Sequence, residues 1–294
     1  MPVERAPTLP APDPATRRPR FTMPPGSCDC HAHVFGPQSR FPYLPSASYI
    51  AHDASPEDYA RMLRTIGCGR AVLVQPSVYG TDNGAMVHAL RSGVFAFRGI
   101  AVVDADVSDR ELQDLHDAGV RGVRINIASD TEGLSLADAP KLAPRLKALG
   151  WHLQFFMDLK KLPDAEEKLG RLGIDLVIDH FGRVRADDGL DAAPFQTMLR
   201  LMKRPNVWAK IMGPYFVSSR APGYVDVAPF ARAVVAAAPD RVVWGSDWPH
   251  PATGRLNVPM PNDGDLADLL LEWVPDEVQR RKVLVDNPAR LYGF

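Results

Sequence analysis

The sequence lacks the features of several large classes of protein. Its 294 residues include only three cysteines, an odd number that argues against a disulfide framework and favours a reducing cytoplasm. No apolar run approaches the roughly 20 residues of a membrane span, and the first residues lack the apolar centre of a signal peptide. A net charge of -1 provides no positive electrostatic potential that would attract a nucleic acid. We therefore expect a cytoplasmic protein with neither a membrane nor a nucleic acid as partner.

The composition divides the chain into an arm and one domain. Residues 1–25 contain eight prolines and several arginines but little apolar surface, which predicts an extended or disordered N-terminal arm. With 46% hydrophobic residues overall, the chain can bury one large core. We expect residues 26–294 to form a single domain.

Short β-rich runs alternate with segments that carry helix signals. Ser55 and Ser108 each begin a helix as cap residues, and Gly67 and Gly119 end these helices. Eight strand and helix pairs in a chain of this length predict an α/β fold, the (β/α)8 TIM barrel. An open, doubly wound sheet is the alternative, but no glycine-rich dinucleotide loop follows any run. The runs are residues 28–36, 70–77, 95–104, 120–127, 152–158, 174–182, 206–213 and 241–249.

The first run carries two histidines two positions apart. On a regular strand Asp29, His31 and His33 share one face, and Cys28 and Cys30 share the other. The two imidazoles then converge on one spot, which suits a divalent metal or a substrate carbonyl. A hydrogen-bonded structural pair is the plainer alternative.

The carboxyl ends of the predicted strands collect polar residues. Active sites of β/α barrels lie at this end, and packing explains few of these side chains well. Their number favours a functional site. They are His31, His33, Gln75, Ser77, Arg124, Gln154, Asp179, His180, Arg183, Lys210 and Asp247.

Several motifs in register resemble a known superfamily. The histidine pair, the segment 179–183 (DHFGR) and the segment 245–250 (GSDWPH) resemble the amidohydrolase superfamily. More narrowly, the chain is similar to 2-pyrone-4,6-dicarboxylate lactonases and related lactone hydrolases. The likeness extends over nearly the whole chain, including the closing segment 287–292 (NPARLY).

The resemblance implies roles for the site residues. Asp247 would be the general base that takes a proton from water, and His31, His33 and His180 would polarise the carbonyl of an anionic lactone. Water, not a side chain, would be the nucleophile. The residues expected to hold the substrate are Arg124, Tyr49, Ser77, Arg183 and Gln154.

A metal is the open question of this chemistry. His31, His33 and Asp247 are a sufficient set for one Zn²⁺ with an open position. However, Gln154 stands where metal-dependent members resemble one another in having a histidine, and Arg124 would repel a cation. We expect that no cofactor is required, with one Zn²⁺ as the alternative.

Departures from the lactonase pattern bear on the substrate. Asp130 and Phe156 stand where the resemblance implies an arginine and a tyrosine, so one carboxylate clamp is missing and a monocarboxylated lactone is expected. The expected function is lactone hydrolysis in aromatic or sugar-acid catabolism. A zinc-dependent decarboxylase, a sugar-acid lactone isomerase and a non-catalytic binding protein are the alternatives, and a homo-oligomer is possible. The sequence leaves the roles of Lys210, Arg220 and His250 open.

Overall fold

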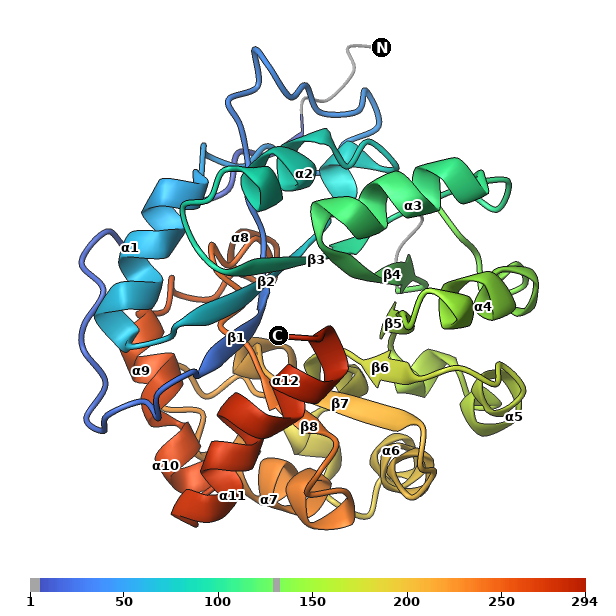
Figure 1. Ribbon diagram of the computed structural model, residues 1–294. Coiled ribbons are helices and arrows are strands. Elements are labelled where there is room, and N and C mark those ends of the chain that lie inside the picture. Colours follow the sequence, from blue (N-terminus) through green and yellow to red (C-terminus); the bar gives the residue numbers. More distant parts are fainter. Residues whose placement is uncertain (1–5, 129–132) are drawn as a thin grey trace, which may run out of the picture.

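The computed structural model describes residues 6–128 and 133–294 and shows a β/α barrel (Figure 1). The eight strands form one sheet in sequence order, and every neighbouring pair is parallel. The predicted fold class is therefore confirmed. The strands are β1 (Cys28–Ala32), β2 (Arg70–Val74), β3 (Phe97–Ala101), β4 (Val120–Asn126), β5 (His152–Phe156), β6 (Leu176–Ile178), β7 (Val207–Ile211) and β8 (Val242–Trp244).

The first and last strands meet through backbone contacts just beyond their ends. Ala32 and Trp248 form a parallel bridge, and the amide of Asp247 donates to the carbonyl of His31 at 2.9 Å. Gly245 permits this approach, because a Cβ there would lie 2.9 Å from the backbone nitrogen of His31. The meeting of β1 and β8 brings Asp247 beside the histidine pair.

Helices surround the barrel and cover its outer face (Figure 1). Ser55 and Ser108 form capping boxes, and Gly67 and Gly119 end the two helices in the left-handed conformation, as the sequence predicts. The helices are α1 (Pro56–Ile66), α2 (Gly84–Arg91), α3 (Asp109–Ala118), α4 (Ala139–Ala148), α5 (Ala165–Gly170), α6 (Ala193–Met202), α7 (Ala228–Ala237), α8 (Thr253–Leu256), α9 (Asp263–Asp268), α10 (Leu270–Trp273), α11 (Glu277–Arg281) and α12 (Asn287–Tyr292).

Two apolar clusters make the core. The larger cluster lies between the strands and the surrounding helices. The smaller one joins residues from β1, β2, β3, β6, β7 and β8 to Tyr292 of α12, and therefore fills the barrel interior. Tyr292 packs at the end where the strands begin, which leaves the opposite end for polar side chains.

The first strand departs from regular alternation. Its register with β2 shifts between Asp29 and Ala32, and Cys28 and Cys30 pack in the interior cluster. The predicted shared face of Asp29, His31 and His33 is thus wrong for Asp29, which accepts hydrogen bonds from the backbone and hydroxyl of Ser246. Burial raises the pKa of Asp29 to about 6. Asp29 ties β1 to β8 and leaves the site to the two histidines.

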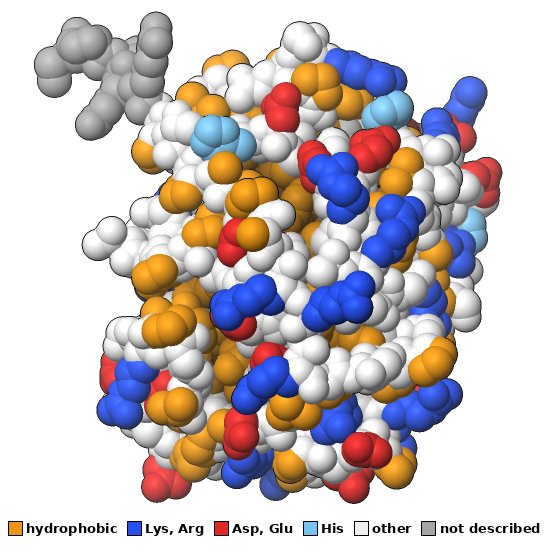
Figure 2. All heavy atoms as spheres, turned by 90° about the vertical axis from the view of Figure 1, so that its left-hand side faces the viewer, with side chains coloured by type: hydrophobic (Ala, Val, Ile, Leu, Met, Phe, Trp, Pro, Cys, Tyr) orange, Lys and Arg blue, Asp and Glu red, His pale blue; other side chains and the backbone are white. Residues whose placement is uncertain are grey.

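The described part of the N-terminal arm runs along the barrel. Arg17 and Arg20 form ion pairs with Asp265 and Asp268 at α9. Helix α9 lies on the left side of Figure 1. Figure 2 shows the molecule from that side, with acidic and basic side chains interspersed on its surface. No helix of the described residues is long and apolar enough to cross a membrane. Of the residues singled out in the sequence, Asp130 lies outside the described ranges.

Candidate active site

A small cavity opens at the carboxyl ends of the strands. Its lining combines imidazoles, a carboxylate, guanidinium groups and aromatic rings. Most of the predicted site residues meet here, from β4, from the loops after β1, β2, β6 and β8, and from the loop before α1. The lining residues are His33, Tyr49, Pro76, Ser77, Arg124, Asn126, Phe156, His180, Phe216, Asp247, Pro251, Ala252 and Arg255.

Three imidazoles surround one carboxylate oxygen. Oδ1 of Asp247 lies 3.7 Å from Nε2 of His31, 3.6 Å from Nε2 of His33 and 3.5 Å from Nε2 of His180. All four side chains are buried. Although burial opposes ionisation, His180 and the other imidazoles hold the pKa of Asp247 well below its usual value. Asp247 is therefore a carboxylate near neutral pH, with Oδ1 facing the histidines.

Backbone strain gathers at the two loops that present this cluster. His180 and Asp247 have φ of 50° and 68°, and His250 has φ of 63°. Such angles are costly outside glycine and concentrate at functional sites. Gly213 makes room for His180, because a Cβ there would lie 2.7 Å from the imidazole. The segments 179–183 and 245–250 thus hold their polar side chains in conformations that packing alone does not require.

The two histidines of the first strand are neutral but differently bonded. Nδ1 of His33 lies 2.7 Å from the carbonyl oxygen of Val74, so Nδ1 carries the proton and Nε2 keeps its lone pair. Burial lowers the pKa of His33, and burial with Lys210 lowers that of His31 well below its usual value. Nε2 of His31 has no hydrogen-bond partner among the described residues. Both rings are therefore neutral near pH 7.

A buried polar layer lies beneath the cavity. Lys210 donates to Gln154, and Gln154 donates to Asp179 at 2.9 Å. Burial raises the pKa of Asp179, but Lys210 and His31 outweigh it and leave the pKa below the usual value. Gln154, a predicted substrate ligand, does not line the cavity, and its amide is already used by Lys210 and Asp179. Gln154 therefore holds Lys210 and Asp179 in place beneath the cavity.

A second set of polar groups lies behind Asp247. The hydroxyl of Tyr215 donates to Oδ2 of Asp247 at 2.5 Å and lies 3.3 Å from Nδ1 of His250. Nε2 of His250 lies 3.1 Å from Oδ1 of Asp263. Burial and Asp247 raise the pKa of Tyr215 well above its usual value, so the hydroxyl keeps its proton. The sequence did not indicate Tyr215 or Asp263 as site residues. His250, whose role the sequence left open, lies between them.

Two guanidinium groups line the cavity, and a third contacts two of the aromatic rings that line it. Arg124 stacks over Phe156 at 4.9 Å, Arg183 lies over Phe156 at 5.2 Å, and Arg255 lies over Tyr49 at 5.3 Å. Arg183 and Arg255 have no hydrogen bond or ion pair with any described residue. Arg255 was missed, because it lies on α8, a four-residue helix without a periodic pattern. These cations favour an anionic ligand.

The side chains of the cluster include three potential ligands of a divalent ion. One ligand atom from each of His31, His33 and Asp247 lies within 4.8 Å of the others, so by position these residues could hold one. The distances from Oδ1 of Asp247 to Nε2 of His31 and of His33, 3.7 and 3.6 Å, are a few tenths of an ångström longer than the about 3.3 Å between ligands of a tetrahedral zinc with bonds of about 2.0–2.1 Å. His33 fits, since its Nε2 keeps a lone pair. The fit of His31 depends on which ring nitrogen carries the proton.

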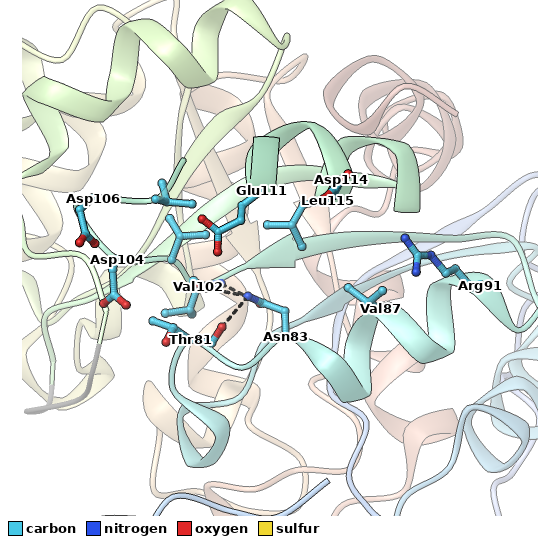
Figure 3. Close-up of a pocket in the computed structure, with 12 residues that line it drawn as sticks. Thr81, Asn83, Val87, Arg91, Val102, Asp104, Asp106, Glu111, Asp114 and Leu115 are labelled. Carbon is cyan, nitrogen blue, oxygen red and sulfur yellow. Dashed lines mark hydrogen bonds between the residues drawn. The ribbon is translucent and has the colours of Figure 1, made fainter. Parts of the chain in front are cut away.

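Another hollow lies between α2 and α3 (Figure 3). Its acidic side chains Asp104, Asp106, Glu111 and Asp114 are exposed to solvent. Asn83, which also lines it, uses its amide to hold the carbonyls of Thr81 and Val102. No buried unpartnered polar side chain of the described residues points into this hollow, which therefore offers no chemistry comparable with that of the Asp247 cluster.

Comparison with known proteins finds relatives over nearly the whole chain. The family model described as amidohydrolase matches residues 28–294. A 4-sulfomuconolactone hydrolase of Hydrogenophaga intermedia is 39% identical over 93% of this chain and 91% of its own. A 2-pyrone-4,6-dicarboxylate hydrolase of Comamonas testosteroni is 40% identical over 94% of this chain and 92% of its own.

A solved structure supports the same grouping. A probable 2-pyrone-4,6-dicarboxylic acid hydrolase of Acinetobacter baumannii, crystallised with citric acid bound, superposes with a TM-score of 0.80 and 29% sequence identity. The match covers 92% of this chain and 100% of the other. Similarity therefore extends over the barrel and its loops.

Proposed function

Because the chain belongs to the amidohydrolase family, we propose that the Asp247 cluster hydrolyses an anionic lactone with water as the nucleophile. The observation that carries this proposal is the convergence of three Nε2 atoms on Oδ1 of one carboxylate, beside unpaired guanidinium groups. A positioned base and donors aimed at a developing oxyanion are the main requirements of acyl transfer. The relatives named as lactone hydrolases support the same reaction.

The reaction needs one proton to be taken up and returned. Water attacks the lactone carbonyl carbon while Oδ1 of Asp247 accepts one of its protons. The imidazoles of His31 and His180 lie beside the position of the carbonyl oxygen, where negative charge develops. The ring carbon–oxygen bond then breaks, and the proton on Asp247 passes to the leaving oxygen. The product carries a freed hydroxyl or enol and a new carboxylic acid, which releases the second proton of the water to the solvent and becomes a carboxylate at neutral pH.

We infer that this reaction requires no metal. Asp247 is ionised and can activate the water, and imidazole and guanidinium groups lie beside the developing oxyanion. Side chains therefore supply both general-base catalysis and stabilisation of the oxyanion. Arg124 also opposes a cation at this place. The binding of one Zn²⁺ by His31, His33 and Asp247 remains the alternative, which metal analysis and chelation test.

The arginines revise the expected substrate. The expectation of a monocarboxylated lactone rested on the missing arginine at position 130 and the missing tyrosine at position 156. It left Arg124 and Arg183 to hold one carboxylate. Arg255, which was not predicted, lines the cavity and is exposed, while Arg124 is buried. Arg183 is half-buried against the lining rings of Phe156 and Phe216. We propose a lactone with two anionic groups, one held by Arg124 with Ser77 and Tyr49, and the other by Arg255 and Arg183.

A panel of lactones tests the function. Purified protein is incubated with 2-pyrone-4,6-dicarboxylate, 4-sulfomuconolactone, muconolactone and a sugar-acid lactone, with and without chelator, and the products are weighed by mass spectrometry. Hydrolysis adds one water, isomerisation leaves the mass unchanged and decarboxylation removes carbon dioxide. We expect the gain of one water in both conditions. A loss of carbon dioxide that stops on chelation would replace our proposal with the zinc decarboxylase.

The cellular setting stays a prediction. All three cysteines are free and buried, which suits a reducing cytoplasm. The named substrates of the relatives point to aromatic catabolism, and a sugar-acid substrate is the alternative. A homo-oligomer also remains a prediction.

A further inference from the structure

Lys210 of β7 is a fully buried lysine directly beneath His31. Its Nζ lies 2.8 Å from the carbonyl oxygen of Cys30, 2.7 Å from Oε1 of Gln154 and 3.2 Å from Nδ1 of His31. Oδ1 of Asp179 is farther away, at 3.5 Å. The ammonium is thus enclosed by acceptors of a single layer, and it does not line the cavity.

The direction of each hydrogen bond in this layer can be assigned. The carbonyl of Cys30 only accepts. The amide of Gln154 is oriented by its Nε2, which donates to Asp179 at 2.9 Å, so Oε1 is the atom that accepts from Lys210. An ammonium has three protons and no lone pair. Two protons go to these acceptors, and the third has Nδ1 of His31 as its nearest remaining partner.

The competing arrangement is a proton on Nδ1 of His31 that points at Asp179. The distance from Nδ1 to Oδ1 of Asp179 is 3.6 Å, which is beyond normal hydrogen-bond range. Oδ1 of Asp179 has no hydrogen-bond partner among the described residues. The shorter contact, from Lys210, therefore determines the state of Nδ1.

We propose that Lys210 is a positioning residue that keeps the proton of His31 on Nε2. A neutral imidazole that accepts at one nitrogen donates at the other. Nε2 of His31 is buried, points toward Asp247 and lacks a partner among the described residues. In the lactone hydrolysis proposed above, on which this role rests, that N–H donates to the carbonyl oxygen as its charge develops.

The same proton decides the fit of a metal. A nitrogen that carries a proton has no lone pair for a cation, so His31 does not fit as a ligand while Lys210 donates to it. His33 has the opposite tautomer, because Nδ1 donates to Val74. Nε2 of His31 is thus a hydrogen-bond donor, whereas Nε2 of His33 is an acceptor. The cluster has the spacing of a metal site without its full donor set.

Nitrogen-15 NMR of the whole protein tests the tautomer directly. Long-range ¹H–¹⁵N correlations of labelled histidine, assigned with His31→Gln, should show His31 protonated on Nε2 and His33 protonated on Nδ1 at pH 7. Protonation of His31 on Nδ1 would overturn the proposal. The wild-type spectrum decides this point even where a Lys210 variant fails to fold.

Zinc binding supplies the second readout. Lys210→Met removes the donor and should raise the affinity of the substrate-free protein for Zn²⁺ at least ~10-fold, measured by competition with a chromophoric chelator, with Lys210→Gln as a second variant. Lys282→Met removes an exposed lysine paired with Asp240 and should leave zinc affinity unchanged. An unchanged affinity in both Lys210 variants would contradict the proposal.

Catalysis distinguishes this inference from the proposed function. Lys210→Met should lower kcat for lactone opening by ~100-fold, as expected for one lost oxyanion donor, with KM changed less than threefold. If the wild-type protein opens no lactone but His31 carries its proton on Nε2, the proposed function fails and the role of Lys210 in the tautomer stands. If wild-type opens the lactone and both Lys210 variants keep its kcat, the function stands and the role of Lys210 fails.

Discussion

The hydroxyl of Tyr215 donates a hydrogen bond of 2.5 Å to Oδ2 of Asp247, while Oδ1 of the same carboxylate faces three imidazoles. The two oxygens of the base therefore have separate surroundings. Oδ2 is held from behind and Oδ1 is turned to the cavity. Since His250 in turn contacts Tyr215, and Asp263 contacts His250, this side of the base is anchored through three buried side chains.

Tyr215→Phe removes the anchor and leaves Oδ2 of Asp247 without its donor. We predict that kcat falls ~10-fold with KM nearly unchanged, and that the free energy of unfolding falls by about 1–3 kcal/mol, the cost of an unsatisfied buried acceptor. Tyr292→Phe is the matched control, because its hydroxyl has no partner among the described residues and lies at the other end of the barrel. Equal effects of both variants on kcat would refute the anchoring role.

Arg255→Met should discriminate between substrates by charge. A charge-assisted hydrogen bond contributes about 1.5–3 kcal/mol, so kcat/KM for a dianionic lactone should fall about 10- to 150-fold. For muconolactone, with one carboxylate, the change should stay below threefold. Arg124→Met should lower kcat/KM for both substrates. A larger loss for muconolactone than for the dianion would support the monocarboxylated substrate instead.

His152 should make the protein sensitive to acid. Burial and Lys210 lower the pKa of His152 to about 3, and neither ring nitrogen has a hydrogen-bond partner among the described residues. The unfolded chain binds the proton near pH 6.5, so stability is fully present above pH 6.5 and falls as pH drops toward 3. This one group contributes a slope of about 1.4 kcal/mol per pH unit within that window.

Urea unfolding of wild-type and His152→Met between pH 7.5 and pH 4 measures that slope. The variant has no ionisable group at this position, so its midpoint should fall less steeply as the pH is lowered. Parallel curves would show that His152 does not titrate differently in the folded and unfolded chains. The remaining slope in the variant reports the other buried histidines, including His31.

Removal of residues 1–20 should weaken substrate binding more than chemistry. Leu9 and Ile50 are joined by a backbone hydrogen bond of 2.8 Å, and a Cβ on Gly254 would lie 2.9 Å from Pro10, so the arm packs against the segments that carry Tyr49 and Arg255. We predict a KM raised several-fold with kcat changed less than threefold. Arg17→Met removes only an exposed ion pair and should change little. A loss confined to kcat would argue against this role of the arm.

The sequence predicted the barrel and most of the cluster because both depend on local patterns. Capping boxes at Ser55 and Ser108 and the alternation of strand and helix determine the element order. The carboxyl ends of the strands then bring His31, His180 and Asp247 together by topology alone. The predicted strands at 174–182 and 241–249 are longer than β6 and β8, because their last residues turn into the strained loops that carry His180 and Asp247.

What the sequence did not predict depends on irregular backbone. The shifted register of β1 moves Asp29 away from the histidine pair, and no periodic pattern signals that shift. Tyr215 and Arg255 lie in short helical turns after β7 and β8, where side-chain direction depends on tertiary contacts. Buried aromatic residues and exposed arginines are common in such turns, so neither residue type indicates a site by itself.

Lactone opening by Asp247→Asn tests the central claim most directly. The amide keeps the shape of the carboxylate but cannot accept the proton of water, so kcat/KM for the best lactone of the panel should fall at least ~100-fold, while Asp240→Asn at the surface stays at the wild-type rate. Circular dichroism of each variant checks that the fold is intact. A folded Asp247→Asn protein that opens the lactone within threefold of the wild-type rate would contradict the account.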